Sequence, residues 1–203
     1  MPKEVAIATV DGRAYYTLTR LLKDAGLPFD AVVPGEQLDR TVRLVITTRK
    51  ENSLIEHHNV ICLEDLGEDI TEMRQRLFGL LYGGKESTFV IGVDPGERIG
   101  VAAYYPRSEV EVEVFESIEK ALDRVERLIQ NANAAKKVVR IGYGKPDIAG
   151  EILRQLRSRG LTVSIELVDE RGTSSLAGSR KRKETRDQRS ARIIALKRGR
   201  KVA

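Results

Sequence analysis

The apolar and polar positions of residues 86–203 predict strands and helices in a definite order. Runs or alternations of apolar side chains predict five strands, at residues 89–94, 101–105, 109–115, 138–142 and 163–168. Apolar residues spaced three and four apart predict helices at residues 118–132, 148–160 and 185–197. The predicted order is therefore β-β-β-α-β-α-β-α, an α/β arrangement with a mixed sheet.

The third of these strands has the strictest alternation. Glu109, Glu111 and Glu113 would lie on one face, and the three intervening and following valines on the other. This pattern is typical of a half-exposed antiparallel strand. Proline-containing turns separate the first three strands, so we expect those strands to form a meander.

Residues 1–85 carry a second, smaller set of elements. Short apolar runs predict strands at residues 5–10, 29–33, 44–47 and 60–63, and helical spacing predicts helices at residues 14–25 and from about residue 69 onward. Strands that alternate with helices are typical of a parallel or mixed sheet covered by helices. We therefore expect a small three-layer α/β domain at 1–85, separated by Gly83-Gly84-Lys85-Glu86 from a second domain at 86–203.

Polar residues follow the predicted strands of the first domain, at the edge where open α/β sheets bind ligands. These residues are Thr9, Asp11, Thr47, Thr48, Arg49 and Lys50. They indicate a ligand site, although polar strand ends are also ordinary in such sheets. We expect His57 and His58 to be surface residues of a polar loop and Cys62 to be a core residue.

The composition indicates a globular protein. Of the 203 residues, 41% are hydrophobic and 32% are charged, unlike the low hydrophobicity of disordered chains. The single cysteine excludes an internal disulfide, a thiolate zinc cage and a cysteine-ligated iron–sulfur cluster. No apolar run approaches the roughly 20 residues of a membrane helix, and the first residues do not resemble a secretory signal. We therefore expect a cytoplasmic protein that does not bind membranes.

Positive charge is concentrated at the end of the sequence. The net charge is +5, but residues 171–203 hold 12 Lys or Arg against 2 Asp or Glu, so the rest of the chain is net negative. This favours nucleic acid as a partner, with a solvated basic tail as the alternative. Aromatic residues make up 5% of the chain and are absent from the basic end. We therefore expect recognition of backbone and shape rather than base stacking.

Acidic residues lie at three predicted element ends. Asp94 ends the first strand of the second domain, Asp169 and Glu170 follow its fifth strand, and Asp187 lies in the first turn of the last helix. If the first and fifth strands are neighbours, these carboxylates converge at one edge of the sheet. Converging carboxylates suit Mg²⁺ or Mn²⁺, and two such ions can promote phosphodiester hydrolysis. The alternative is a plain turn, a helix cap and a salt-bridge partner.

Three motifs in this order resemble those of the YqgF/RuvX family, which has an RNase H-like fold. They are Gly92-Val93-Asp94-Pro95-Gly96, Asp169-Glu170-Arg171 followed by Thr173-Ser174, and Asp187-Gln188-Arg189-Ser190-Ala191. The resemblance covers about residues 87–199. It implies a metal-dependent nuclease related to RuvC, in which Asp94, Glu170 and Asp187 are the catalytic, metal-binding carboxylates and Asp169 is a further candidate ligand. It also implies four-way DNA junctions or precursor ribosomal RNA as substrates.

Basic residues beside these carboxylates are candidate nucleic-acid contacts. The candidates are Arg171, Arg180, Lys181, Arg182, Lys183 and Arg189. The four consecutive ones lie between two of the predicted metal ligands, where they could hold the phosphates that flank a scissile bond; a solvated loop is the alternative. Gly92 and Gly96 would let a phosphate backbone approach the strand end. RuvC has a catalytic glutamate near the fourth strand, where the nearest acid here is Asp147, which we expect to be solvated.

Two functions remain open from the sequence. The first is a divalent-metal-dependent endonuclease acting on structured nucleic acid, and the second is a non-catalytic nucleic-acid-binding module on the same RNase H-like scaffold. An actin-like or sugar-kinase-like ATPase is disfavoured, because residues 1–85 lack the β-β-β-α order that a second half would need. A junction resolvase would favour a homodimer, whereas an RNA-processing nuclease has no such need.

Overall fold

The computed structural model describes residues 3–106, 108–169 and 185–202. The chain divides into two compact units, Met1–Leu81 and Tyr82–Ala203. Both units combine helices with a sheet, so the mixed α/β class expected from the sequence is confirmed. No helix in the described part of the chain is long and apolar enough to cross a bilayer.

The first unit is built on a four-stranded, fully parallel sheet. Its strands are β1 (Val5–Ala8), β2 (Phe29–Val32), β3 (Leu44–Thr47) and β4 (Val60–Cys62), and its helices are α1 (Gly12–Asp24) and α2 (Ile70–Tyr82), the last residue of which begins the second unit. The strand order is β2-β1-β3-β4, so the chain crosses from β2 past β1 to reach β3. The carboxyl ends of all four strands therefore lie at one edge of this sheet.

The two faces of this sheet are covered in different ways. Helix α1 begins where the Asp11 carboxylate accepts the N–H groups of Arg13 and Ala14, and it buries its apolar stripe. On the face that carries Ala6 and Val45, the packing side chains belong to strands and loops. This face of the sheet is therefore covered by loop residues such as Val42, Leu38 and Ile55, where the expected three-layer domain would have a helix.

The described residues of the second unit form a six-stranded mixed sheet and three helices. Its elements are β5 (Gly84–Asp94), β6 (Ile99–Tyr105), β7 (Ser108–Phe115), α3 (Ile118–Asn131), β8 (Ala134–Gly142), α4 (Pro146–Ser158), β9 (Ser164–Val168), α5 (Arg186–Leu196) and β10 (Arg200–Val202). The strand order is β10-β9-β8-β5-β6-β7. Strands β5, β8 and β9 are parallel to one another, while β6, β7 and β10 pair antiparallel to their neighbours. The short strand β10 was not predicted from the sequence.

One strand separates the first and fifth predicted strands of the second unit, β5 and β9. Strand β8 pairs with β5 on one side and with β9 on the other. Adjacent strands lie about 4.8 Å apart, so the end of β9, which leads to Asp169, is two strand spacings from Asp94. The condition under which the carboxylates of these two strands would converge is therefore not met, and their convergence does not follow from strand pairing.

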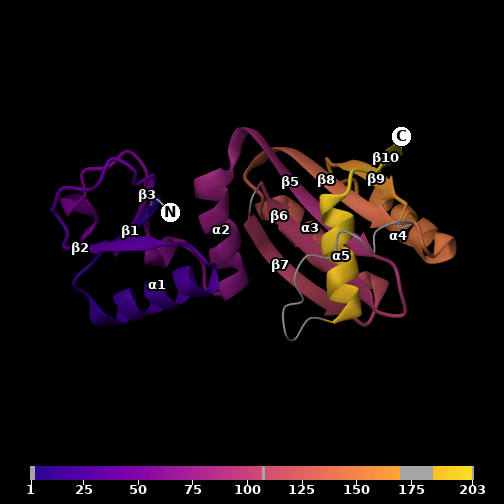
Figure 1. The fold of residues 1–203 in the computed structure, drawn as a ribbon, viewed down its shortest axis with the longest axis horizontal. Helices are drawn as coiled ribbons and strands as arrows, with labels where there is room; N and C mark the ends of the chain where they lie inside the picture. The colour runs from indigo at the N-terminus through magenta and orange to yellow at the C-terminus, as the bar shows by residue number, and fades with distance from the viewer. Residues whose placement is uncertain (1–2, 107, 170–184, 203) are drawn as a thin grey trace. The chain divides into compact units, whose positions relative to one another are not determined.

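Strand β7 does not keep its three glutamates on one face, contrary to the prediction. The pairing of β7 with β6 shifts register here: Glu109 pairs with Tyr104 and Glu111 with the adjacent Ala103, so that Val110 has no partner on β6 and forms a β-bulge. Glu109 binds Arg192 of α5, whereas Glu111 binds Arg124 of α3. Because α5 and α3 lie on opposite faces of the sheet (Figure 1), the bulge turns the two carboxylates to opposite sides.

Helix α5 lies across one face of the six-stranded sheet (Figure 1). Two glycines permit the contact. An ideal Cβ on Gly92 would lie 2.3 Å from the Ala191 carbonyl oxygen, and one on Gly100 would lie 2.4 Å from the Asp187 carbonyl oxygen. Only a residue without a Cβ leaves room for a helix backbone at this distance. Gly92 therefore serves helix packing, not the approach of a phosphate backbone that we expected.

Candidate functional site

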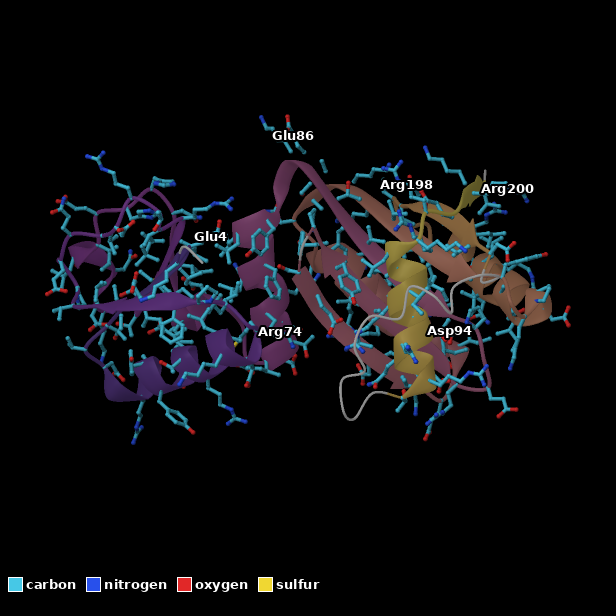
Figure 2. The ribbon with its side chains drawn as sticks, viewed as in Figure 1. Glu4, Arg74, Glu86, Asp94, Arg198 and Arg200 are labelled. Atoms are coloured by element: carbon cyan, nitrogen blue, oxygen red, sulfur yellow. The ribbon has the colours of Figure 1, made fainter. Side chains whose placement is uncertain are left out.

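Asp94 and Asp187 line one polar cavity of about 520 Å³. Asp94 is the last residue of β5 and Asp187 lies in the first turn of α5. Gly100 pairs with Asp94 in the sheet, and the Asp187 carbonyl oxygen lies directly over Gly100. Figure 2 shows Asp94 beside α5. The fold thus brings two of the predicted carboxylates together from distant parts of the sequence.

The first turn of α5 is held by a capping box. The Thr185 hydroxyl accepts the Gln188 N–H at 3.3 Å, and the Gln188 side chain accepts the Thr185 N–H at 3.0 Å. This reciprocal pair fixes the backbone on both sides of Asp187. The side chain of Asp187 is 24% exposed, so it is partly shielded yet open to the cavity.

The cavity carries charges of both signs. A guanidinium nitrogen of Arg98 lies 2.8 Å from a carboxylate oxygen of Asp187, and Lys145 and Arg186 also line the cavity. Lys145 precedes the first residue of α4, so the N-terminal ends of α4 and α5 both lie at this site. Helix N-termini attract anions. The site therefore combines acceptors for a cation with groups that favour a phosphate.

The donor types fit a hard divalent cation. Carboxylate oxygens are preferred ligands of Mg²⁺ and Mn²⁺, and Asp94 and Asp187 supply them. Within residues 3–106, 108–169 and 185–202, no group of three or more His, Cys, Asp or Glu side chains is placed to hold a metal. A cation at Asp94 and Asp187 would complete its shell with water and substrate oxygens, as Mg²⁺ commonly does.

The other predicted site residues fall into two groups. Glu170, Arg171, Arg180, Lys181, Arg182 and Lys183 lie outside the described residues. Asp169 follows β9 and does not line the cavity; its carbonyl oxygen accepts a bond from Lys197 at 2.6 Å. Arg189 in α5 and Asp147 in α4 are also absent from the lining. Their predicted roles remain predictions.

A buried ion pair fixes the other end of α5. Arg140 of β8 donates to Glu166 of β9 at 2.9 Å and to the Ala195 carbonyl oxygen at 2.5 Å. Burial disfavours the charged form of Glu166, but bonds from Arg140 and the Gly199 N–H outweigh it and hold the pKa of Glu166 below its usual value. The last turn of the helix is thus tied to the sheet through Ala195, as its first turn is over Gly100.

In the first unit, Glu51 occupies the strand edge at which the sequence offered either a ligand site or ordinary polar strand ends. Its carboxylate accepts bonds from the Thr9 hydroxyl at 2.5 Å, the Thr48 hydroxyl at 2.6 Å and the Val10 N–H at 2.8 Å. Thr9 follows β1 and Thr48 follows β3, which are the adjacent strands at which the order of the sheet reverses. Ligands of open α/β sheets bind at this crevice, and here a side chain of the protein lies in it.

We expect Glu51→Gln to weaken the first unit in a pH-dependent way. Burial opposes the charge of Glu51, but the bonds from Thr48, Thr9 and Val10 outweigh it, so the pKa of Glu51 lies below its ordinary value of 4.5. The carboxylate therefore stabilises the fold above that pH and loses its contribution as the pH falls through the lowered pKa. The variant should lose about 1–2 kcal/mol at pH 7.

Amide hydrogen exchange in β1 and β3 measures this effect within the first unit. Protection at pH 7 should fall in the variant, and the difference from wild type should shrink as the pH falls below 4.5. Equal protection of the two proteins at pH 7 would show that the bonds of Glu51 to Thr9, Val10 and Thr48 do not stabilise the first unit.

Sequence reasoning missed the cationic side of the cavity in the second unit. Arg98, Lys145 and Arg186 were not predicted to be site residues, although each lies within five residues of a predicted strand end or helix start. A search for basic residues in the turns that follow Asp94 and Gly142 would have found the first two. The ion pair between Arg98 and Asp187 has no local sequence signal, because it joins residues that are distant in the chain.

Comparisons with known proteins give a match to a family model and similarities to solved structures. Residues 4–68 match the family model of the response regulator receiver-like domain, and the order β2-β1-β3-β4 of this unit begins the doubly wound order 2-1-3-4-5. No curated protein matches the chain.

Among solved structures, the chain is similar to Marinitoga piezophila Argonaute in complex with 5′ OH guide RNA and target DNA. The identity is 11% and the TM-score 0.34, over 81% of this chain and 39% of Argonaute, so the chain spans well under half of that protein. It is also similar to the large terminase of a thermophilic bacteriophage, with 10% identity and a TM-score of 0.29, over 83% of this chain and 70% of the terminase. By sequence, then, the first unit is similar to receiver-like domains.

Proposed function

We propose that the second unit is a divalent-metal-dependent endonuclease that cleaves structured nucleic acid on an RNase H-like scaffold. The observation that carries the proposal is the meeting of Asp94 and Asp187 in one polar cavity together with Lys145, Arg186 and two helix N-termini. The three motifs that resemble the YqgF/RuvX family add support, because two of them supply these carboxylates. Four-way DNA junctions and precursor ribosomal RNA are the substrates that this resemblance suggests.

In this proposal the carboxylates hold Mg²⁺ or Mn²⁺, which would activate a water and stabilise the leaving oxygen of a phosphodiester. The basic side chains of the protein itself bind the substrate and not the metal. Lys145 and Arg186 attract the phosphate, and the two helix N-termini orient it toward Asp94 and Asp187. The basic residues between Arg171 and Arg189 extend this attraction along the nucleic acid.

One contact favours the second candidate function, a nucleic-acid-binding module without catalysis. Arg98 already neutralises Asp187 at 2.8 Å, so this carboxylate has a structural partner without any metal. In that case the cations of the cavity still bind phosphate, while Asp94 and Asp187 only hold α5 and the neighbouring turn in place. Metal binding separates the two candidates.

Mn²⁺ should raise the melting temperature of the protein if the carboxylates form a metal site. Binding to the folded state at a hundred times Kd stabilises by about 2.7 kcal/mol, which corresponds to a rise of roughly 5–10 °C for a unit of this size. Asp187→Asn should abolish the rise. The experiment is a thermal unfolding series over Mn²⁺ concentration, followed by circular dichroism.

Asp147→Asn is the matched control, since it removes a carboxylate close to the cavity that does not line it. This variant should keep the Mn²⁺-dependent rise. If wild type shows no rise at millimolar Mn²⁺, or if Asp187→Asn retains it, the metal site is elsewhere or absent and the non-catalytic module becomes the better description.

A further inference from the structure

A second cavity lies on the same face of the six-stranded sheet, next to the last turn of α5. Its volume is about 830 Å³, which is within the range of small-molecule sites. Apolar and aromatic side chains of the strands form part of its lining, among them Val90, Tyr104 and Val138. Basic side chains complete the lining, among them Lys136, Arg198 and Lys201. Figure 2 shows Arg198 beyond the end of the helix, away from Asp94.

The cavity exists because α5 ends before the sheet does. The helix stops at Leu196, and the chain turns through Gly199 into β10. The backbone of α5 therefore covers the sheet at Gly92. It does not cover Val90, which is the preceding position of β5 on the same face. Leu196 is 68% exposed at the rim, so the cavity has an apolar wall as well as an apolar floor.

The acids of this cavity are already neutralised. Glu109 accepts two bonds from Arg192, at 2.7 and 2.9 Å, and one from the Tyr104 hydroxyl at 2.6 Å. Burial and the neighbouring Glu109 raise the pKa of Tyr104, so its phenol stays protonated and donates. Glu166 is paired with Arg140. These two carboxylates therefore add little negative potential to the cavity.

Three cations around the cavity are not neutralised in this way. Lys136, Arg198 and Lys201 are exposed, and within the described part of the chain none of them forms an ion pair, although the charge of Lys136 helps Arg140 to lower the pKa of Glu166. Val90, Val138 and the ring of Tyr104 give the same cavity an apolar and aromatic lining. A ligand that matches it has a flat, weakly polar part and at least one phosphate.

We infer that this cavity binds one nucleotide of the nucleic-acid strand on which the second unit acts, with the base against Tyr104 and a phosphate at Lys136 and Lys201. The inference rests on the proposed function. Helix α5 has 11 residues, so its axis spans about 16 Å between the two cavities. The nucleotide in this cavity is therefore not the one at Asp94 and Asp187, and its binding positions the strand without taking part in bond cleavage.

Equilibrium binding of a short fluorescent single strand, in the presence of a chelator that prevents cleavage, tests this inference. Lys136→Glu/Lys201→Glu should weaken binding by on the order of tenfold or more and reduce the dependence of affinity on salt. The matched control is Lys120→Glu/Arg127→Glu, which makes the same charge change at two exposed residues of α3, on the opposite face of the sheet. The control should weaken binding much less.

Tyr104→Leu tests the contact with the base separately from charge. Loss of stacking should weaken binding by roughly fivefold or more, while the salt dependence stays as in wild type. Tyr104→Phe keeps the ring and loses only the hydroxyl, with its bonds to Glu109 and Arg192, so it should bind as wild type does. Circular dichroism spectra of all variants check that the fold is retained.

The outcomes separate this inference from the proposed function. If wild type binds the strand and the lysine double variant binds as tightly as the α3 control, the cavity is not a nucleotide site, while the proposed function stands. If wild type binds neither this strand nor a four-way DNA junction or a structured RNA, the proposed function itself fails. If a free mononucleotide binds the cavity without displacing the bound strand, the cavity is a site for small nucleotides. Its assignment to the substrate strand is then overturned.

Discussion

Asp94→Asn should abolish metal-dependent cleavage and leave nucleic-acid binding nearly unchanged. The asparagine side chain has the same shape but lacks the negative charge that holds a divalent cation. Loss of several kcal/mol of transition-state stabilisation corresponds to a rate decrease on the order of a thousandfold or more. The cations that attract phosphate, such as Lys145 and Arg186, are not altered, so the affinity should remain.

The measurement is a cleavage assay on a four-way DNA junction, a linear duplex DNA and a structured RNA, each with Mg²⁺ or Mn²⁺. The ranking of the three substrates by wild type selects between junction and RNA roles. Asp147→Asn serves again as the control and should cleave at the wild-type rate. Normal cleavage by Asp94→Asn would show that the reacting centre is not at this cavity, and binding of all three substrates without cleavage by wild type would favour the non-catalytic module.

Gly92→Ala should destabilise the second unit strongly. The added Cβ would lie 2.3 Å from the Ala191 carbonyl oxygen and 2.4 Å from the Ala195 backbone nitrogen, and neither backbone atom can move without shifting α5. Overpacking of this kind costs about 3 kcal/mol. Because α5 carries Asp187, the variant should also lose the Mn²⁺-dependent rise in melting temperature.

Gly150→Ala is the control for this experiment. Gly150 lies in the interior of α4, and an added Cβ would meet nothing within 4 Å. Alanine is favoured over glycine in a helix by up to about 1 kcal/mol, so this variant should be as stable as wild type or more stable. Urea unfolding and hydrogen exchange in β8 report both effects. A Gly92→Ala protein with wild-type stability would mean that α5 does not lie as close to the sheet as the structure indicates.

The elements themselves were largely predictable from the sequence. Helix α5 was expected at 185–197 and is found at Arg186–Leu196, because its apolar spacing and the Thr185 cap are local signals. Strand β10 was missed, since three residues such as Arg200–Val202 carry no recognisable period and form a strand only because β9 offers an unpaired edge.

The candidate site was predictable only in part. Asp94 and Asp187 were identified because each stands at the end of an element with a clear apolar pattern. Their meeting was expected on the condition that β5 and β9 are neighbours, and β8 separates these strands. What brings them together is the close approach of α5 over Gly92 and Gly100.

The sequence alone determined the positions of most helices and strands, the carboxylates at their ends and the concentration of positive charge from residue 171 onward. These features depend on residues that are neighbours in the chain, so a short window contains the information. The tertiary structure decided the rest: which strand lies between β5 and β9, which face receives Glu109, and that Glu51 closes the crevice of the first unit. Each depends on contacts between distant residues, and such contacts form only once both faces of a sheet are packed.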